Sequence, residues 1–240
     1  MSLLGKLIGV GVGPGAPDLL TMRAHRAITN APVIAYPAPD DGKSFARSIV
    51  TEFIAPTQIE IPIIIPMRSE RYPAVEVYDQ AADDLRKHLD NNHDIAVLCE
   101  GDPFFYGSFM YLHDRLAGDY ETEIIPGISS PLAASAVLNL PLVSRNDVLT
   151  ILPAPGENDD LQRQILAADT TVIMKLGRHA PRIVSLLGEM GLIDRAYYAE
   201  RVTIEGSQFT CRLAELGNRE VPYFSMIIVQ RNSSVQGARA

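Results

Sequence analysis

The sequence predicts an α/β fold with two α/β domains, and three observations indicate this class. Short apolar runs alternate with stretches of helical periodicity, an order typical of βαβ units around a largely parallel sheet. Three of the apolar runs lead into loops rich in glycine, proline and small polar residues that precede a helix. The chain has 240 residues, 47% of them apolar, which is enough for one large or two modest domains with a sizeable core.

The first domain is expected to span residues 1–142. Its strands are apolar runs, and its helices repeat apolar residues every three or four positions. Pro62 and Pro66 bracket a run of isoleucines, so the third strand is expected to be short or to lie at a sheet edge, because proline cannot donate to a central ladder. In chain order the expected elements are strand 6–12, helix 19–30, strand 32–36, helix 44–52, strand 59–65, helix 73–91, strand 94–99, helix 104–117, strand 121–125 and helix 131–139.

The second domain is expected to span residues 143–240, after a junction at 140–145. A loop at 153–160, rich in proline, glycine and acidic residues, separates its first strand from its first helix. The expected elements are strands 148–152, 171–175, 196–200 and 223–230, with helices 159–168 and 180–190 between them.

Three strand-loop-helix corners of the first domain point to one shared pocket. They are Gly13–Gly15, Glu100–Gly107 and Pro126–Pro131, and each directly follows an expected strand. In open parallel sheets ligands bind at the carboxyl ends of the strands. Asp102 and Pro103 read as a helix start, since aspartate caps helices and proline suits the first helical position.

Several other kinds of site lack their motifs. A dinucleotide fingerprint needs glycine at position 14 or 16, where Pro14 and Ala16 stand, and no P-loop or G-x-S-x-G string is present. The five histidines form no metal-ligand spacing, so no metal site is predicted. A net charge of −8 argues against a nucleic-acid partner, and no apolar run is long enough to span a membrane. The start does not read as a signal peptide, and two distant cysteines fit the reducing cytoplasm.

Motifs in both halves resemble those of the tetrapyrrole (corrin/porphyrin) methyltransferases, which use S-adenosylmethionine. Further segments make the chain most similar to the members that methylate carbon 20 of precorrin-2 in cobalamin biosynthesis. The family motifs are Gly11–Gly15 with Pro17 and Leu19–Thr21, Gly101–Pro103 with Tyr106 and Gly107, Pro126–Ser130, Met174–Gly177, Glu200–Thr203 and Tyr223–Ile227, and the further segments are 35–39, 44–47, 99–112 and 145–150.

The resemblance implies a tetrapyrrole methylase-like fold with a largely parallel N-terminal sheet, a mixed C-terminal sheet and the active site between the domains. It implies S-adenosylmethionine as cofactor, precorrin-2 as substrate and precorrin-3A as product. A homodimer in the cytoplasm is expected, with no nucleic-acid or membrane partner. Whether the tetrapyrrole already holds cobalt stays open.

Residue roles follow partly from chemistry and partly from the resemblance. Carbonyl and carboxylate groups of Glu100, Gly101 and Asp102 suit a sulfonium cation. With these, the expected cofactor-binding residues are Pro14, Phe105, Ser129, Ser130, Met174, Lys175 and Val202. For Asp102 and the two serines, helix capping is an alternative role, and for Phe105 it is core packing.

The substrate would carry many carboxylates, which suit arginine forks. The expected substrate-binding residues are Tyr36, Lys43, Arg47, Arg145 and Arg178, with Arg68 and Arg71 as further cations, although solvated surface charge is the alternative for each. Lys43 and Arg47 are four apart and would share a helix face. Tyr36, Glu100 and Tyr223 are candidate bases, and Tyr223 is the preferred catalytic residue.

Two other function classes compete with a tetrapyrrole methyltransferase. A non-catalytic tetrapyrrole carrier would have no use for S-adenosylmethionine, so cofactor binding discriminates. A methyltransferase of the same fold acting on RNA or protein is disfavoured by the acidic balance and by the aromatic string at 104–109.

Overall fold

The computed structural model describes residues 4–40, 42–65 and 74–232. The chain divides into two compact units, Met1–Ser130 and Pro131–Ala240. This division falls earlier than the expected boundary at 142/143. The segment before that boundary is held by strands of the second unit, where the Thr170 hydroxyl donates to the carbonyl of Leu142 and the Gln230 amide to that of Pro141, both at 2.6 Å.

The first unit contains one five-stranded sheet with the order β3-β2-β4-β1-β5, and every neighbouring pair is parallel. The predicted parallel sheet is therefore confirmed, as is the edge position of β3, which carries Pro62. The elements are β1 (Leu7–Gly11), α1 (Met22–Asn30), β2 (Val33–Pro39), α2 (Phe45–Ile49), β3 (Ile59–Ile65), α3 (Ala74–Leu89), β4 (Ile95–Cys99), α4 (Phe109–Leu116) and β5 (Thr122–Ile125), with short 3₁₀ turns at Pro17–Leu19 and Thr51–Phe53.

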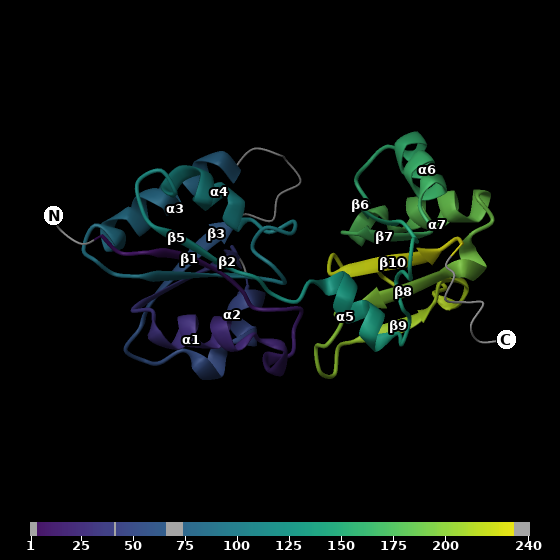
Figure 1. Cartoon of the computed structure of the whole chain (residues 1–240). Coiled ribbons are helices and arrows are strands. Elements are labelled where there is room, and N and C mark those ends of the chain that lie inside the picture. Colours follow the sequence, from purple (N-terminus) through teal and green to yellow (C-terminus); the bar gives the residue numbers. More distant parts are fainter. Residues whose placement is uncertain (1–3, 41, 66–73, 233–240) are drawn as a thin grey trace. The chain divides into compact units, whose positions relative to one another are not determined.

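Helices cover both faces of this sheet (Figure 1). Alternate residues of each strand point to opposite faces. Leu7 and Val97 thus pack under α3 and α4, whereas Val10 and Leu98 pack against α1 and α2. Both faces are buried, which explains why the strands read as continuous apolar runs rather than as alternating ones.

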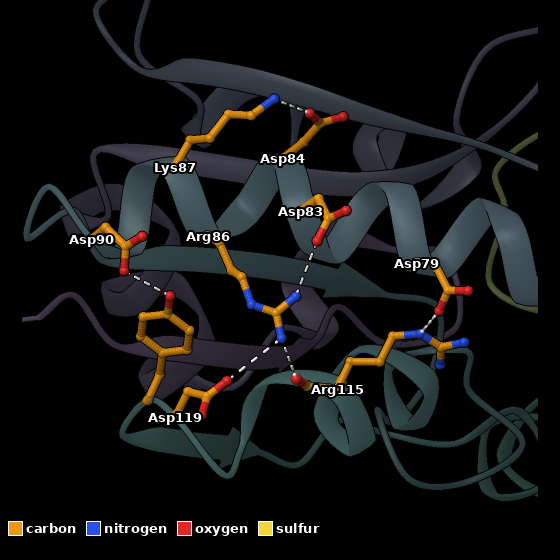
Figure 2. Close-up of polar contacts among 9 residues, drawn as sticks. Asp79, Asp83, Asp84, Arg86, Lys87, Asp90, Arg115 and Asp119 are labelled. Carbon is orange, nitrogen blue, oxygen red and sulfur yellow. Dashed lines mark hydrogen bonds and ion pairs between the residues drawn. The ribbon is translucent and has the colours of Figure 1, made fainter.

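A polar network fastens α4 and the turn after it onto α3 (Figure 2). The Arg86 guanidinium donates to the carbonyl of Arg115 at 2.8 Å and lies 3.5 Å from the carboxylate of Asp119. The Arg115 side chain in turn donates to Asp79 at 2.6 Å. Single exposed ion pairs add little stability, but a shared network holds a helix in one position. The network thus joins the C-terminal end of α4 to α3.

The second unit contains a mixed sheet, as predicted, and its strand order is β6-β7-β10-β8-β9. Strands β6 and β7 are parallel, and the other pairs are antiparallel. Helices α6 and α7 supply Leu161 and Ile183 to the same apolar core as Ile173 and Ile227 of the strands. The elements are α5 (Ser130–Val137), β6 (Leu149–Pro153), α6 (Asn158–Ala167), β7 (Thr170–Met174), α7 (Ala180–Glu189), β8 (Ala196–Glu200), β9 (Phe209–Arg212) and β10 (Ser225–Gln230), with 3₁₀ turns at Gly177–His179, Ile193–Arg195 and Leu213–Glu215.

Two predictions about elements were wrong. The edge strand β9 was missed, because its four residues, although they alternate between apolar and polar types, are too few to be distinguished from a loop. The helix expected over 104–117 begins only at Phe109. Tyr106 has a φ of 55°, and a side chain on Gly107 would lie 2.6 Å from the carbonyl oxygen of Pro103, so the chain turns here before the helix starts. Within the described residues, no helix has the length and apolar character needed to cross a bilayer.

Candidate functional site

The three predicted corners lie side by side at the carboxyl edge of the first sheet, because β4, β1 and β5 are neighbours. The first two corners are joined through their backbones. The N–H of Gly101 donates to the carbonyl of Gly13 at 2.8 Å, and the N–H of Gly13 donates back to Gly101 at 3.2 Å. The loops after β1 and β4 are therefore held together by two backbone hydrogen bonds just beyond the strands.

Asp102 joins the second corner to the third. One carboxylate oxygen accepts the N–H of Phe104 at 2.9 Å, and the other accepts the N–H of Gly127 at 3.1 Å. The expected helix cap is thus wrong, because Asp102 caps a turn and a neighbouring loop, while α4 has Ser108 at its N-cap position. Charge-assisted bonds of this kind are stronger than neutral ones. Asp102 is a structural link of the site.

Three glycines allow the corners to approach this closely. A Cβ on Gly127 would lie 2.0 Å from the carbonyl oxygen of Gly101, and a Cβ on Gly11 would lie 2.5 Å from the backbone nitrogen of Gly127. Gly101 has a φ of +66°, which side-chain-bearing residues rarely adopt. A Cβ there would have only Ser129 Cα, at 3.8 Å, and the Ile128 carbonyl, at 3.9 Å, within 4 Å. The position that a Cβ on Gly101 would occupy is therefore unfilled, and it lies in contact distance of Ser129.

Of the cofactor-binding residues predicted in this unit, the loops bring Pro14, Gly101, Asp102 and Ser129 together. Pro14 is buried next to the Gly13–Gly101 pair, and Ser130 follows Ser129 as the first residue of α5. Phe105 is half-buried and makes an edge contact with Tyr106, at 5.2 Å between ring centroids. Of these residues, Ser129 lies next to the position that a Cβ on Gly101 would occupy.

Glu100 is a carboxyl group in a poorly solvated position at the end of β4. Burial raises its pKa, and the backbone N–H groups of Glu100 itself and of Ala46 act in the opposite direction. A carboxyl group with a raised pKa is characteristic of binding and catalytic sites. Glu100 therefore supplies a carboxyl group at the same edge.

The candidate residues of the second unit gather at one edge of its own sheet. Met174 pairs with Met226 in the register of β7 and β10, and the N–H of Arg201 donates to the carbonyl of Phe224 at 2.9 Å. A Cβ on Gly177 would lie 3.6 Å from Tyr223 Cα. Predicted residues Lys175, Val202 and Tyr223 therefore share this edge, where Val202 is 4% exposed and Tyr223 is 52% exposed.

This second edge holds unusual backbone. Lys175, Arg201 and Thr203 have φ values of 58°, 46° and 67°, in the left-handed region that residues with side chains avoid. Such conformations cost of order 1–3 kcal/mol each and persist only where the surroundings impose them. The three residues directly follow β7 and β8, so the loops at this edge are held in a specific conformation.

The predicted substrate-binding residues do not form one cluster. Arg47 makes two hydrogen bonds to Glu60, at 2.5 and 2.9 Å, and its guanidinium carbon lies 5.9 Å from the ring centroid of Tyr36. The bonds from Arg47 lower the pKa of Glu60, while burial and then hydrogen bonding to Glu60 raise the pKa of Tyr36. The predicted shared helix face of Lys43 and Arg47 is wrong, since α2 begins only at Phe45.

The remaining predicted cations are exposed. Lys43 precedes α2, Arg178 lies in the 3₁₀ turn after β7, and Arg145 lies between α5 and β6 with a φ of 52°. Arg68 and Arg71 lie outside the described residues.

A buried polar cluster at the second edge was not predicted. Glu200, the last residue of β8, accepts hydrogen bonds from the Tyr198 hydroxyl and from Arg219. The sequence showed Glu200 only as part of a family motif. Its signal was a charged residue at the end of an otherwise apolar strand, but the partner, nineteen positions away, could not be recognised.

Comparisons with known proteins identify a family and several similar proteins. Residues 6–217 match the family described as tetrapyrrole (corrin/porphyrin) methylases. The chain is 38% identical over 234 residues to a precorrin-2 C(20)-methyltransferase of Sinorhizobium sp, covering 94% of this chain and 95% of that protein. It is 29% identical over 230 residues to a cobalt-precorrin-2 C(20)-methyltransferase of Salmonella typhimurium, covering 95% and 97%.

Among solved structures, the fold is similar to that of a uroporphyrin-III C-methyl transferase from Thermus thermophilus, in complex with S-adenosyl homocysteine. The TM-score is 0.69 at 23% sequence identity, and the likeness covers 98% of this chain and 100% of that one.

Proposed function

Because the chain belongs to the tetrapyrrole (corrin/porphyrin) methylase family, we propose that it transfers a methyl group from S-adenosylmethionine to carbon 20 of precorrin-2, giving precorrin-3A in cobalamin biosynthesis. The observation that carries this proposal is the 38% identity, over nearly the full length of both chains, to a precorrin-2 C(20)-methyltransferase. The three joined corners also support it, because their backbone can contact a ligand, and they carry no phosphate-binding motif, which S-adenosylmethionine does not need.

The residues fit this cofactor. Gly101 leaves open the space that a Cβ would enter, with Ser129 on one side. A sulfonium is a cation, so the carboxyl groups of Glu100 and Asp102 favour its approach. We assign cofactor binding to Pro14, Glu100, Gly101, Asp102, Phe105, Ser129 and Ser130 in the first unit and to Met174, Lys175 and Val202 in the second.

When bound, S-adenosylmethionine supplies an electrophilic methyl group and leaves as a neutral thioether. The nucleophile is a meso carbon made electron-rich by the pyrrole nitrogens, and this carbon loses a proton after the methyl bond forms. The protein's main contribution is alignment of the reacting atoms and exclusion of water. Tyr223, exposed at the second edge, is the proposed acceptor of that proton.

The acidic periphery of the tetrapyrrole requires cations. We assign this role to Lys43, Arg145 and Arg178, which are exposed, and to Arg47 beside Tyr36. Arg47 already pairs with Glu60, so it would offer the substrate a guanidinium whose position is fixed in advance. We further propose a cytoplasmic homodimer, in which Cys99 and Cys211 remain the free thiols they are in the structure. Light scattering at micromolar concentration tests the dimer, and a monomer would contradict it.

Incubation of the protein with precorrin-2 and S-adenosylmethionine tests the function. The product mass should increase by one methyl group, and omission of the cofactor should abolish the increase. Cobalt-loaded precorrin-2 in a parallel reaction tests the metal-free assignment, which rests on the higher identity to the relative whose name specifies no cobalt. Faster transfer to the cobalt form would reassign the substrate, and no transfer to either form would reject the proposal. Binding of tetrapyrrole without binding of S-adenosylmethionine would favour a carrier.

A further inference from the structure

Glu200 is a buried acid at the strand end that leads into Val202. Its side chain is 1% exposed, although it ends β8 at the edge where the second unit's candidate residues gather. A carboxylate is strongly destabilised in such a place unless it is paired and hydrogen-bonded. The groups that satisfy Glu200 therefore determine whether this edge keeps its shape.

Two side chains satisfy Glu200. The Tyr198 hydroxyl donates to it at 2.5 Å, and the Arg219 guanidinium donates to both of its oxygens, at 2.6 and 3.3 Å. The guanidinium carbon of Arg219 also lies 4.0 Å from the ring centroid of Phe209, the first residue of β9. Burial by itself would raise the pKa of Glu200, but the bonds from Arg219 and Tyr198 outweigh burial, and the pKa is lowered. Glu200 thus remains charged.

Arg219 belongs to the loop that precedes β10, and this loop carries Tyr223. Downstream of Arg219 the loop is held at two further points. The Ser225 hydroxyl donates to the carbonyl of Pro222 at 2.5 Å, and the Arg201 N–H donates to the carbonyl of Phe224. The loop is therefore tied to the end of β8 on both sides of Tyr223.

The Glu200–Arg219 pair lies directly before residues with a strained backbone. Arg201 and Thr203, with left-handed φ values, directly follow Glu200 and flank Val202. Strained backbone of this kind requires surroundings that leave it no alternative. A rigid carboxylate–guanidinium pair immediately before Arg201 supplies such a constraint, because a fork bonded at two points fixes orientation as well as distance.

We propose that Arg219 and Glu200 are positioning residues that hold the 201–203 loop and the Tyr223 segment in the geometry that binds S-adenosylmethionine and aligns the proton acceptor. This inference rests on the proposed function for the identity of the ligand. Neither side chain needs to touch the ligand, since both act through the backbone that follows them.

Arg219→Ala tests the proposal, and Arg212→Ala is its matched control. Arg212 also lies over an aromatic ring of the β8–β9 hairpin, with its guanidinium carbon 5.3 Å from the ring centroid of Tyr197, and it donates to the carbonyl of Asp194 at 3.0 Å. It lies near the opposite end of β8 from Glu200. Arg219→Lys keeps the charge but loses the planar fork, so it should rescue only part of the effect.

Three measurements on the full chain are required. Titration calorimetry with S-adenosylhomocysteine should show at least tenfold weaker binding for Arg219→Ala, an intermediate loss for Arg219→Lys and a change below twofold for Arg212→Ala. Hydrogen exchange of the ligand-free protein should show faster exchange in 201–204 and 223–225 for Arg219→Ala, with 170–174 unchanged. In turnover assays, Arg219→Ala should raise the KM for S-adenosylmethionine. It should also lower kcat, because Tyr223 loses its position.

The outcomes separate this inference from the proposed function. If wild-type protein binds no S-adenosylhomocysteine, the proposed function fails, and hydrogen exchange still tests the positioning role. Unchanged exchange in 201–204 for a folded Arg219→Ala variant would overturn the inference. So would cofactor affinity lost equally in Arg212→Ala, because the effect would then be general destabilisation of the hairpin.

Discussion

Gly127→Ala places a methyl group where the second and third corners touch. The new Cβ would lie 2.0 Å from the Gly101 carbonyl oxygen and 2.8 Å from Gly11 Cα. Close carbon–oxygen contacts are about 3.3 Å, so the loops must separate by about 1.3 Å. Both neighbours are backbone atoms, which a rotamer change cannot move. Overpacking of this kind costs about 1–3 kcal/mol, or roughly 2–12 °C in Tm for a chain of this size.

The functional loss should exceed the loss of stability. A misplacement of about 1 Å at a binding site can cost on the order of 10²-fold. Calorimetry with S-adenosylhomocysteine should therefore show at least tenfold weaker binding in a variant that is still folded by circular dichroism. Gly118→Ala is the matched control, since no atom lies within 4 Å of its Cβ, and it should keep or slightly raise Tm. Wild-type affinity and Tm in Gly127→Ala would refute the interlocked corners.

Three other perturbations follow from the same geometry. Gly101→Val should abolish S-adenosylhomocysteine binding in thermal-shift titrations, because the side chain would occupy the position beside Ser129. The variant should stay folded, since its Cβ would meet no atom closer than 3.8 Å outside its chain neighbours, but the φ of +66° should lower its Tm. A normal ligand-induced shift would contradict the placement of the cofactor. Arg47→Ala with Arg145→Ala should weaken precorrin-2 binding far more than cofactor binding in equilibrium titrations, and equal losses would argue against their role as substrate cations. The pKa of Glu60 is lowered in the folded state, so its contribution to stability is complete above its unfolded value and is lost as pH falls through the lower folded value. Wild type should therefore lose more Tm than Glu60→Gln between pH 7 and pH 3.5, and parallel losses would contradict the pair with Arg47.

The sequence predicted the strand ends better than the contacts between them. Pro62 and Pro66 predicted that β3 is short or lies at an edge, and the structure has it at the edge. The three glycine-rich corners were located because strand-to-helix turns need special backbone. Each corner follows a strand of the predicted parallel sheet. Because the carboxyl ends of parallel strands lie at the same edge, the corners were expected at one edge. These predictions depended only on local residue types and on rules of topology.

The sequence did not indicate the contacts between residues that are far apart in the chain. Asp102 was expected to cap its own helix, but one of its oxygens accepts an N–H from Gly127, twenty-five positions away. Arg219 gave no signal at all, since an arginine in a polar loop is usually solvated, and its partner is a buried residue of another strand. Such pairings depend on how loops fold over a sheet edge, which residue spacing does not encode.

The position of the transferred methyl group tests the central claim most directly. Precorrin-2 is incubated with the protein and with S-adenosylmethionine labelled with carbon-13 in its methyl group, and the product is examined by carbon NMR. We predict a single labelled methyl resonance on carbon 20, because a fixed carboxylate periphery presents only one meso carbon to the donor. A label on any other carbon, or no label despite bound cofactor, would contradict the assignment.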